Sequence, residues 1–209
     1  MLSMKTTRIG LGIAAIAVAM ALFPINSRGA DLLEPIGRMD HPIGSASAPV
    51  TIIEYSSPTC PHCVDYRTQV APEIEKEFIE RGKARLIFRP FVRNNVDMAI
   101  FMLCEWQEGS KYQELTKLFY SKYDEIAQTG DIEKELRDIA ASAGIDKPTF
   151  DRLVSDQSIL DGLSKLTSQA RDDFKVEGTP TFFVNGKKFT GAQSAEEMRA
   201  NIEEASKPH

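Results

Sequence analysis

Two cysteines in the run Cys60-Pro61-His62-Cys63 carry the clearest chemistry in this sequence. They are two of only three cysteines in 209 residues, and they follow an apolar run at residues 50–55 that reads as a buried strand. A cysteine at the start of a helix faces unsatisfied N–H groups and a partial positive charge, which favour its thiolate. Since the thiolate is the form that attacks disulfides, this spacing predicts a reactive dithiol.

A Cys-x-x-Cys pair also occurs in zinc sites, which need two further ligands. The remaining soft ligands are Cys104, His41 and His209, and none of them is in paired spacing. The sequence therefore favours redox chemistry over metal binding. We expect no metal and no bound organic cofactor, because the Cys60–Cys63 disulfide would itself be the redox group.

The elements that would hold the dithiol follow from the pattern of apolar residues. Residues 32–49 form a lead-in punctuated by Pro and Gly, with a turn expected at 40–44. After the strand, a helix is predicted from Cys60 to about Gly82, because apolar residues recur at helical spacing. Pro72 lies inside this helix and predicts a kink.

The rest of the chain returns from helices to strands. In chain order we predict a strand at 83–92, a helical block at 95–176, a hairpin of strands at 181–184 and 187–190, and a final helix. Asn185-Gly186 favours the tight hairpin turn. Ser194 and Glu197 have the spacing of a capping box for the final helix. The predicted order is β, α, β, helical block, β, β, α.

The N-terminal residues differ in composition from the remainder. Lys5 and Arg8 precede an apolar stretch at residues 9–23, and small or polar residues then continue to Ala30. This order is typical of a secretory signal peptide and predicts export, with an uncleaved membrane anchor as the alternative.

The composition limits the class of protein. Hydrophobic and charged fractions of 42% and 26% are those of an ordinary soluble globule. Without residues 1–29 the chain has 22 basic and 30 acidic residues, a net charge of −8. Because an acidic domain is a poor electrostatic match for nucleic acid, we expect no nucleic-acid partner.

With these elements in place, the sequence resembles thioredoxin-fold proteins of the DsbA type. The Pro-His dipeptide between the cysteines is typical of that family. Thr179-Pro180 falls just before a strand, where the family has its cis-proline loop, and Glu54 matches the family's buried acid. The resemblance covers about residues 50–205 and is closest to the soluble bacterial branch with Thr before the cis-proline. It implies an α/β thioredoxin fold with an inserted helical domain.

The N-terminal composition and the resemblance together divide the chain into parts. These are a signal peptide at 1–29, an N-terminal lead-in at 30–49, a thioredoxin-fold domain at 50–94 and 177–207, and an inserted helical domain at 95–176.

The resemblance also implies roles for the residues around the dithiol. Cys60 would be the exposed nucleophile, and Cys63, one turn further into the helix, its buried partner. His62 would donate to the Cys60 sulfur or lie near it, with an exposed helix-start residue as the alternative. Pro61 suits the first helical turn, where no N–H bond is lost.

Two further positions would act on the dithiol from elsewhere in the chain. Thr179 and Pro180 would form a cis bond facing it, and the backbone of Thr179 could pair with an extended substrate; an ordinary trans turn is the alternative. Glu54 would accept the proton of the buried thiol, directly or through water, or else pair as a carboxylate with a base such as Arg89. Cys104, on an apolar helix, is expected to be a small core residue.

The function implied is that of a periplasmic thiol:disulfide oxidoreductase that gives the Cys60–Cys63 disulfide to reduced exported proteins. A quinone-linked membrane oxidase of the DsbB type would reoxidise it. One alternative is a disulfide isomerase or reductase; the short lead-in argues against the dimerisation domain of related isomerases, so we expect a monomer. Another is a peptide-binding, chaperone-like module that uses the same fold.

Overall fold

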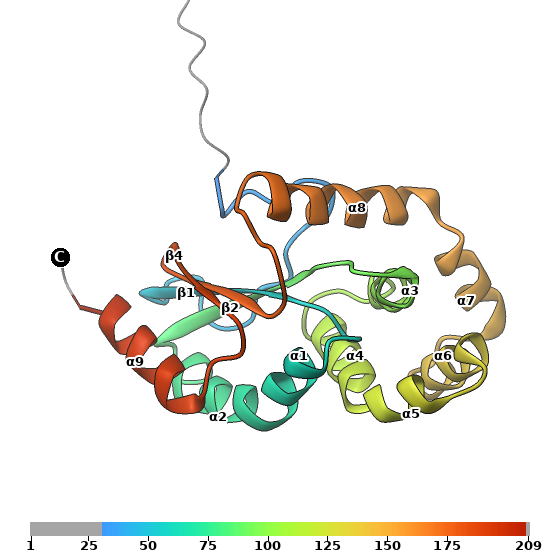
Figure 1. The fold of residues 1–209 in the computed structure, drawn as a ribbon, viewed down its shortest axis with the longest axis horizontal. Helices are drawn as coiled ribbons and strands as arrows, with labels where there is room; N and C mark the ends of the chain where they lie inside the picture. The colour runs from blue at the N-terminus through green and yellow to red at the C-terminus, as the bar shows by residue number, and fades with distance from the viewer. Residues whose placement is uncertain (1–30, 208–209) are drawn as a thin grey trace, which may run out of the picture.

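The computed structural model describes residues 31–207, so the predicted signal peptide lies outside the described residues. A mixed sheet forms the centre, with strands in the order β2-β1-β3-β4 (Figure 1). The strands are β1 (Val50–Ser56), β2 (Ala84–Pro90), β3 (Thr181–Val184) and β4 (Lys187–Thr190). β2 runs parallel to β1, whereas β3 is antiparallel to both β1 and β4.

Strand β2 is shorter than the predicted 83–92. At its start, the N–H of Lys83 donates to Phe78 O at 2.8 Å and so closes the preceding helix. At its end, Pro90 is the last residue of the strand, and the N–H of Phe91 still donates to Ser56 O at 2.9 Å.

Alternation along β1 divides its side chains between two buried faces. Val50 and Ile52 pack against the helices that follow β1 and against the C-terminal helix α9 (Ala195–Ala205). Ile53 and Tyr55 face the other layer, where α8 (Gln157–Asp172) lies across the sheet (Figure 1). By the same alternation, even-numbered residues of β1 share the face under the dithiol helix.

The helix that begins at the dithiol is irregular where the sequence predicted a kink. It consists of α1 (Pro61–Asp65), the π turn η1 (Tyr66–Val70), α2 (Ala71–Ile74) and a second π turn η2 (Glu75–Ile79). In η1 the N–H of Ala71 donates to Tyr66 O, five residues back. Pro72 follows directly and has no N–H to donate, so the irregularity takes the form of a π turn.

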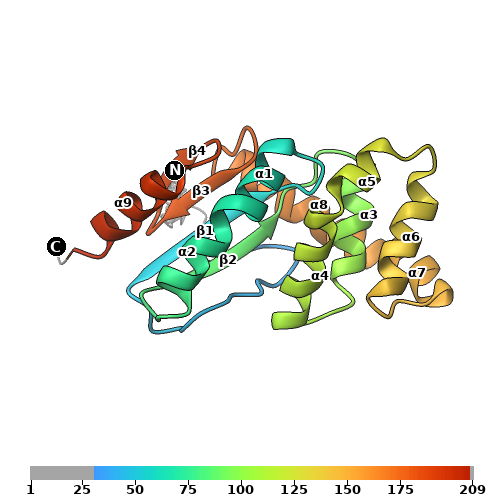
Figure 2. The same cartoon turned by 90° about the horizontal axis from the view of Figure 1, so that it is seen from below.

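The predicted helical block is confirmed as a bundle inserted between β2 and β3, beside the sheet (Figures 1 and 2). Its helices are α3 (Asn95–Cys104), α4 (Ser110–Ser121), α5 (Tyr123–Gln128), α6 (Ile132–Ser142), α7 (Lys147–Val154) and α8. Helix α3 lies at the centre of the block, and its residues 100–104 are all buried. Cys60 and Cys63 belong to the same apolar cluster, so the block's core continues under the dithiol.

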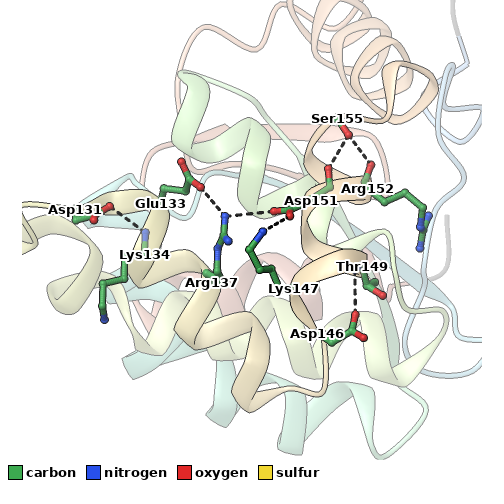
Figure 3. A network of polar contacts seen from close by, with 10 residues as sticks. All are labelled: Asp131, Glu133, Lys134, Arg137, Asp146, Lys147, Thr149, Asp151, Arg152 and Ser155. Atoms are coloured by element: carbon green, nitrogen blue, oxygen red, sulfur yellow. Dashed lines mark hydrogen bonds and ion pairs between the residues drawn. The ribbon is translucent and has the colours of Figure 1, made fainter.

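The outer helices α6 and α7 are joined by a network of exposed ion pairs (Figure 3). Arg137 on α6 pairs with Glu133 at 2.5 Å and with Asp151 on α7 at 3.3 Å, and Lys147 reaches Asp151 at 2.6 Å. Because such exposed pairs contribute about 0–1 kcal/mol each, this network orients two helices and adds little to stability.

The C-terminal elements form as predicted. Asn185 and Gly186 have φ of 44° and 84°, the positive values of the predicted hairpin turn. Ser194 and Glu197 make the predicted capping box at the start of α9.

The lead-in turns within the expected range 40–44. In addition, Ile43 forms an antiparallel bridge to Leu86 at the edge of β2, with two backbone hydrogen bonds of 2.9 Å. The turn falls at Gly44, whose φ is 93° and where a Cβ atom would lie 2.8 Å from Ile79 Cγ2. Among residues 31–207, no helix combines the length and apolar composition that crossing a bilayer requires.

Candidate functional site

The two cysteines lie where β1 passes into α1. Cys60 is the N-cap residue of α1, with extended backbone angles, and Pro61 occupies the first helical turn as expected. Cys63 lies one turn inside the helix and is fully buried, while Cys60 is 5% exposed. Both are free thiols, so the structure represents the reduced dithiol.

The two thiols differ strongly in acidity. The pKa of Cys60 is lowered from 9.0 to about 5, chiefly by a hydrogen bond from the Cys63 thiol, which outweighs the effect of burial. Thr179, the backbone of Cys63 and the charge of Arg93 lower it further. The pKa of Cys63 is raised, first by burial and then by the neighbouring Cys60. The site therefore holds one thiolate at neutral pH, on the outer sulfur.

The peptide bond between Thr179 and Pro180 is cis, as the sequence predicted. It faces the dithiol, because Cys60 Sγ lies 3.3 Å from Thr179 O. Thr179 Oγ1 is buried without a close hydrogen-bond partner among the described residues, and its hydroxyl lowers the pKa of both cysteines. This loop therefore places a carbonyl and a hydroxyl beside the reacting sulfurs.

His62 is exposed on the first turn of α1. Within residues 31–207 its ring forms no hydrogen bond with the Cys60 sulfur, whose neighbours are Cys63 and Thr179. The stabilisation of the Cys60 thiolate described above therefore comes from other groups.

Glu54 is fully buried on β1, and its partner is Arg67, with Arg67 Nη1 3.2 Å from Glu54 Oε2. Burial raises the pKa of Glu54, and the charge of Arg67 opposes this shift. Arg67 is also buried and pairs with Glu75 at 3.2 Å, and Glu75 in turn pairs with Lys117 at 2.5 Å.

Glu54 does pair with a base, as the alternative expected, but that base is Arg67 and not Arg89. Arg89 lies opposite Tyr55 in the β1–β2 register, whereas Glu54 lies opposite Phe88. Arg89 is therefore on the other face of the sheet, where it donates to Tyr55 Oη at 2.8 Å and to Asp40 at 2.7 Å. One residue of register decides which arginine a carboxylate can reach.

A buried carboxylate that the sequence analysis missed holds the loop before Cys60. Asp97, at the start of α3, accepts hydrogen bonds from Ser57 Oγ at 2.8 Å and from the N–H and hydroxyl of Thr59 at 3.1 and 2.8 Å. Asn94 caps α3 by accepting from the N–H of Asp97, and it also donates to Thr59. The signal available in the sequence was the Asn-x-x-Asp pattern of a helix start after the second strand.

Cys104 is confirmed as a core residue. It is fully buried on α3, and burial raises the pKa of its thiol to about 12. Among the described residues, no group of three or more His, Cys, Asp or Glu side chains has a metal-binding arrangement.

Comparison with known proteins places this site in context. The family model described as Thioredoxin matches residues 38–204. A Rickettsia felis protein described as a candidate protein-disulfide oxidoreductase is 28% identical over 168 residues, which cover 79% of this chain and 60% of that protein. Disulfide bond formation protein D of Bacillus subtilis is 23% identical over 165 residues, covering 77% of this chain and 74% of that protein.

Among solved structures, alpha-DsbA1 from Wolbachia pipientis superposes with a TM-score of 0.74 at 25% identity, covering 80% of this chain and 90% of that one. This chain spans only 60% of the length of the Rickettsia felis relative.

Proposed function

Because this chain belongs to the thioredoxin family, with a DsbA-like helical insertion at α3–α8, we propose that it is a protein-disulfide oxidoreductase. It gives the Cys60–Cys63 disulfide to reduced proteins. The observation that carries this proposal is the lowered pKa of Cys60, about 5, at the start of α1.

The acidity of Cys60 sets the direction of electron flow. Only the reduced form has a thiolate, so whatever stabilises the thiolate stabilises the reduced form. At neutral pH a pKa of about 5 in place of 9.0 stabilises the reduced form by about 2–3 kcal/mol. For a two-electron couple this makes the disulfide more oxidising by about 40–60 mV.

The order of the reaction steps follows from the different burial of Cys60 and Cys63. A substrate thiolate attacks Cys60, the sulfur nearer solvent, and forms a mixed disulfide while Cys63 leaves as a thiolate. A second substrate thiolate then attacks the substrate sulfur of that bond, and Cys60 leaves as the stable anion. The cis loop offers Thr179 O next to Cys60 to a substrate backbone in extended conformation. Glu54 exchanges a proton with Cys63 below the dithiol.

In this proposal the substrates are reduced proteins exported to the periplasm, and a DsbB-type quinone-linked membrane oxidase restores the disulfide. The apolar N-terminal stretch supports export.

The test is disulfide formation in a reduced, unfolded substrate protein by the oxidised enzyme. The Cys60→Ser variant should be inactive, and the Cys104→Ala variant, altered at the buried third cysteine, should retain activity. Full activity of Cys60→Ser would refute the mechanism. A reduction potential near that of thioredoxin, about −270 mV, would favour the reductase alternative.

A further inference from the structure

Four buried side chains from three elements meet beneath the dithiol. Glu54 and Ser56 lie two residues apart on β1 and so share the face of the sheet under α1. Cys63 of α1 and Tyr120 of α4 belong to one apolar cluster, and Tyr120 bonds to Ser56. Glu54, Ser56 and Cys63 are completely buried and Tyr120 is 1% exposed, so bulk water does not surround this cluster.

The hydroxyl of Ser56 is the central polar group of the cluster. Tyr120 Oη donates to Ser56 Oγ at 2.8 Å. A serine hydroxyl has one donor and two acceptor positions, so this bond leaves one acceptor and one donor free. Burial raises the pKa of Glu54 and that of Cys63, and Ser56 acts against both shifts.

Glu54 also has a free acceptor position. Arg67 pairs with Oε2 of its carboxylate, while Oε1 is buried without a hydrogen-bond partner among the described residues. An unpartnered buried oxygen is costly. It is also able to bind a proton that arrives from a neighbouring donor.

We propose that the Ser56 hydroxyl relays the proton between the Cys63 thiol and the Glu54 carboxyl, and that Tyr120 holds Ser56 in position. This inference rests on the proposed oxidoreductase function and deepens it. It assigns the path to a side chain of the protein, whereas the sequence analysis left open whether Glu54 accepts the proton directly or through water.

The proton moves along this path in one direction when the disulfide is donated and in the other when it is restored. When a substrate thiolate bonds to Cys60, the Cys60–Cys63 bond breaks and its electron pair stays on Cys63. Ser56 then gives its proton to the Cys63 thiolate and takes one from protonated Glu54. On reoxidation by a partner disulfide, Cys63 gives its proton to Ser56, Ser56 passes one to the Glu54 carboxylate, and the Cys63 thiolate attacks the mixed disulfide at Cys60.

The charged groups around Glu54 suit an acceptor that gains and loses a proton. Burial raises its pKa, and Arg67 acts against this shift from η1. Glu75 pairs with Nη2 of Arg67, whereas Glu54 pairs with Nη1, and the exposed Lys117 on α4 pairs with Glu75. Burial raises the pKa of the Tyr66 phenol on η1, and the charge of Glu54 raises it further. Cys60 is the group that faces Cys63 from above.

The test isolates the step in which Cys63 must lose its proton. Cys60 of the full chain is converted to its mixed disulfide with glutathione, and release of glutathione by Cys63 is followed in stopped flow across a range of pH. The variants are Ser56→Ala and Tyr120→Phe. The matched control is Tyr112→Phe, which removes the hydroxyl of another buried tyrosine on α4.

We expect Ser56→Ala to slow glutathione release by about tenfold or more at neutral pH, with the rate recovering as pH rises. Tyr120→Phe should slow it less, and Tyr112→Phe should match the wild type. Adding Glu54→Gln to Ser56→Ala should cause little further loss, since both changes interrupt one path. The pKa of Cys60 should stay near 5 in Ser56→Ala, which a general disturbance of the site would not allow.

A Ser56→Ala protein that releases glutathione at the wild-type rate with an unchanged pH profile overturns the relay. If Ser56→Ala does not fold, Tyr120→Phe is compared with its control, Tyr112→Phe. Equal rates of glutathione release by these two variants would also overturn the relay. Failure of the proposed function looks different, because the wild-type protein would then not transfer its disulfide to a reduced substrate at all.

Discussion

The low pKa of Cys60 predicts how the stability of the reduced protein depends on pH. The Cys60→Ser variant isolates this contribution, because it removes the ionising thiol. The folded-state pKa is about 5 and that of an ordinary cysteine is 9.0. A group whose pKa is lowered by folding stabilises the folded state fully above its unfolded pKa. That stabilisation is lost as the pH falls through the folded pKa.

The magnitude follows from the pH interval. Between the folded pKa and about pH 7 lie about two pH units, and each contributes about 1.4 kcal/mol, which gives about 3 kcal/mol. Because the outer side of Cys60 is near solvent, screening reduces this to about 2 kcal/mol. Serine does not ionise in this range, so the variant lacks the whole contribution.

The assay is urea unfolding of both reduced proteins, the wild type and Cys60→Ser, at about pH 4 and about pH 7. Other titrating groups are common to both proteins, so the difference between their unfolding free energies reports Cys60. We expect that difference to grow by about 2 kcal/mol in favour of the wild type as the pH rises. A difference that is the same at both pH values would refute the assigned acidity.

Three further outcomes are expected. Cys63→Ala should raise the pKa of Cys60 by about one to two units, because it removes a charge-assisted hydrogen bond of about 1.5–3 kcal/mol, while Cys63→Ser should preserve part of the shift; ultraviolet thiolate absorbance against pH measures both. Asp97→Ala should destabilise the protein by about 3 kcal/mol in urea unfolding, because it leaves the buried hydroxyl of Ser57 without its acceptor; a loss below about 1 kcal/mol would contradict this. Iodoacetamide should label the native reduced protein at Cys60 and reach Cys104 only after unfolding, as peptide mass spectrometry would show.

The dithiol and its immediate elements could be predicted from the sequence because their signals are local. Two cysteines, a proline at the first helical turn and a preceding apolar run lie within about fifteen residues. The hairpin turn at Asn185-Gly186 and the capping box at Ser194 are equally local, and the structure confirms both.

The groups around the dithiol could not be predicted in the same way, because they come together through long-range register. Asp97 reaches Ser57 across 40 residues, and Tyr120 reaches Ser56 across 64. Arg67 lies four residues after Cys63, so helical spacing already placed it on the buried side. Its pairing with Glu54 was missed because an arginine on β2 was considered instead.

Side chains alternate between the two faces of β1, and for this reason the two buried arginines, Arg67 and Arg89, have different partners. Glu54 faces the dithiol helix and Arg67, while its neighbour Tyr55 faces Arg89 and Asp40 on the opposite side of the sheet. The Arg89–Asp40 pair ties the lead-in to β2 without adding charge beneath Cys63. A shift of one residue in the β1–β2 register would bring Arg89 to the Glu54 face, as a second cation beside the carboxylate. That cation would favour the ionised carboxylate and oppose the burial that raises the pKa of Glu54, so the proton exchange with Cys63 depends on the register as much as on the residues themselves.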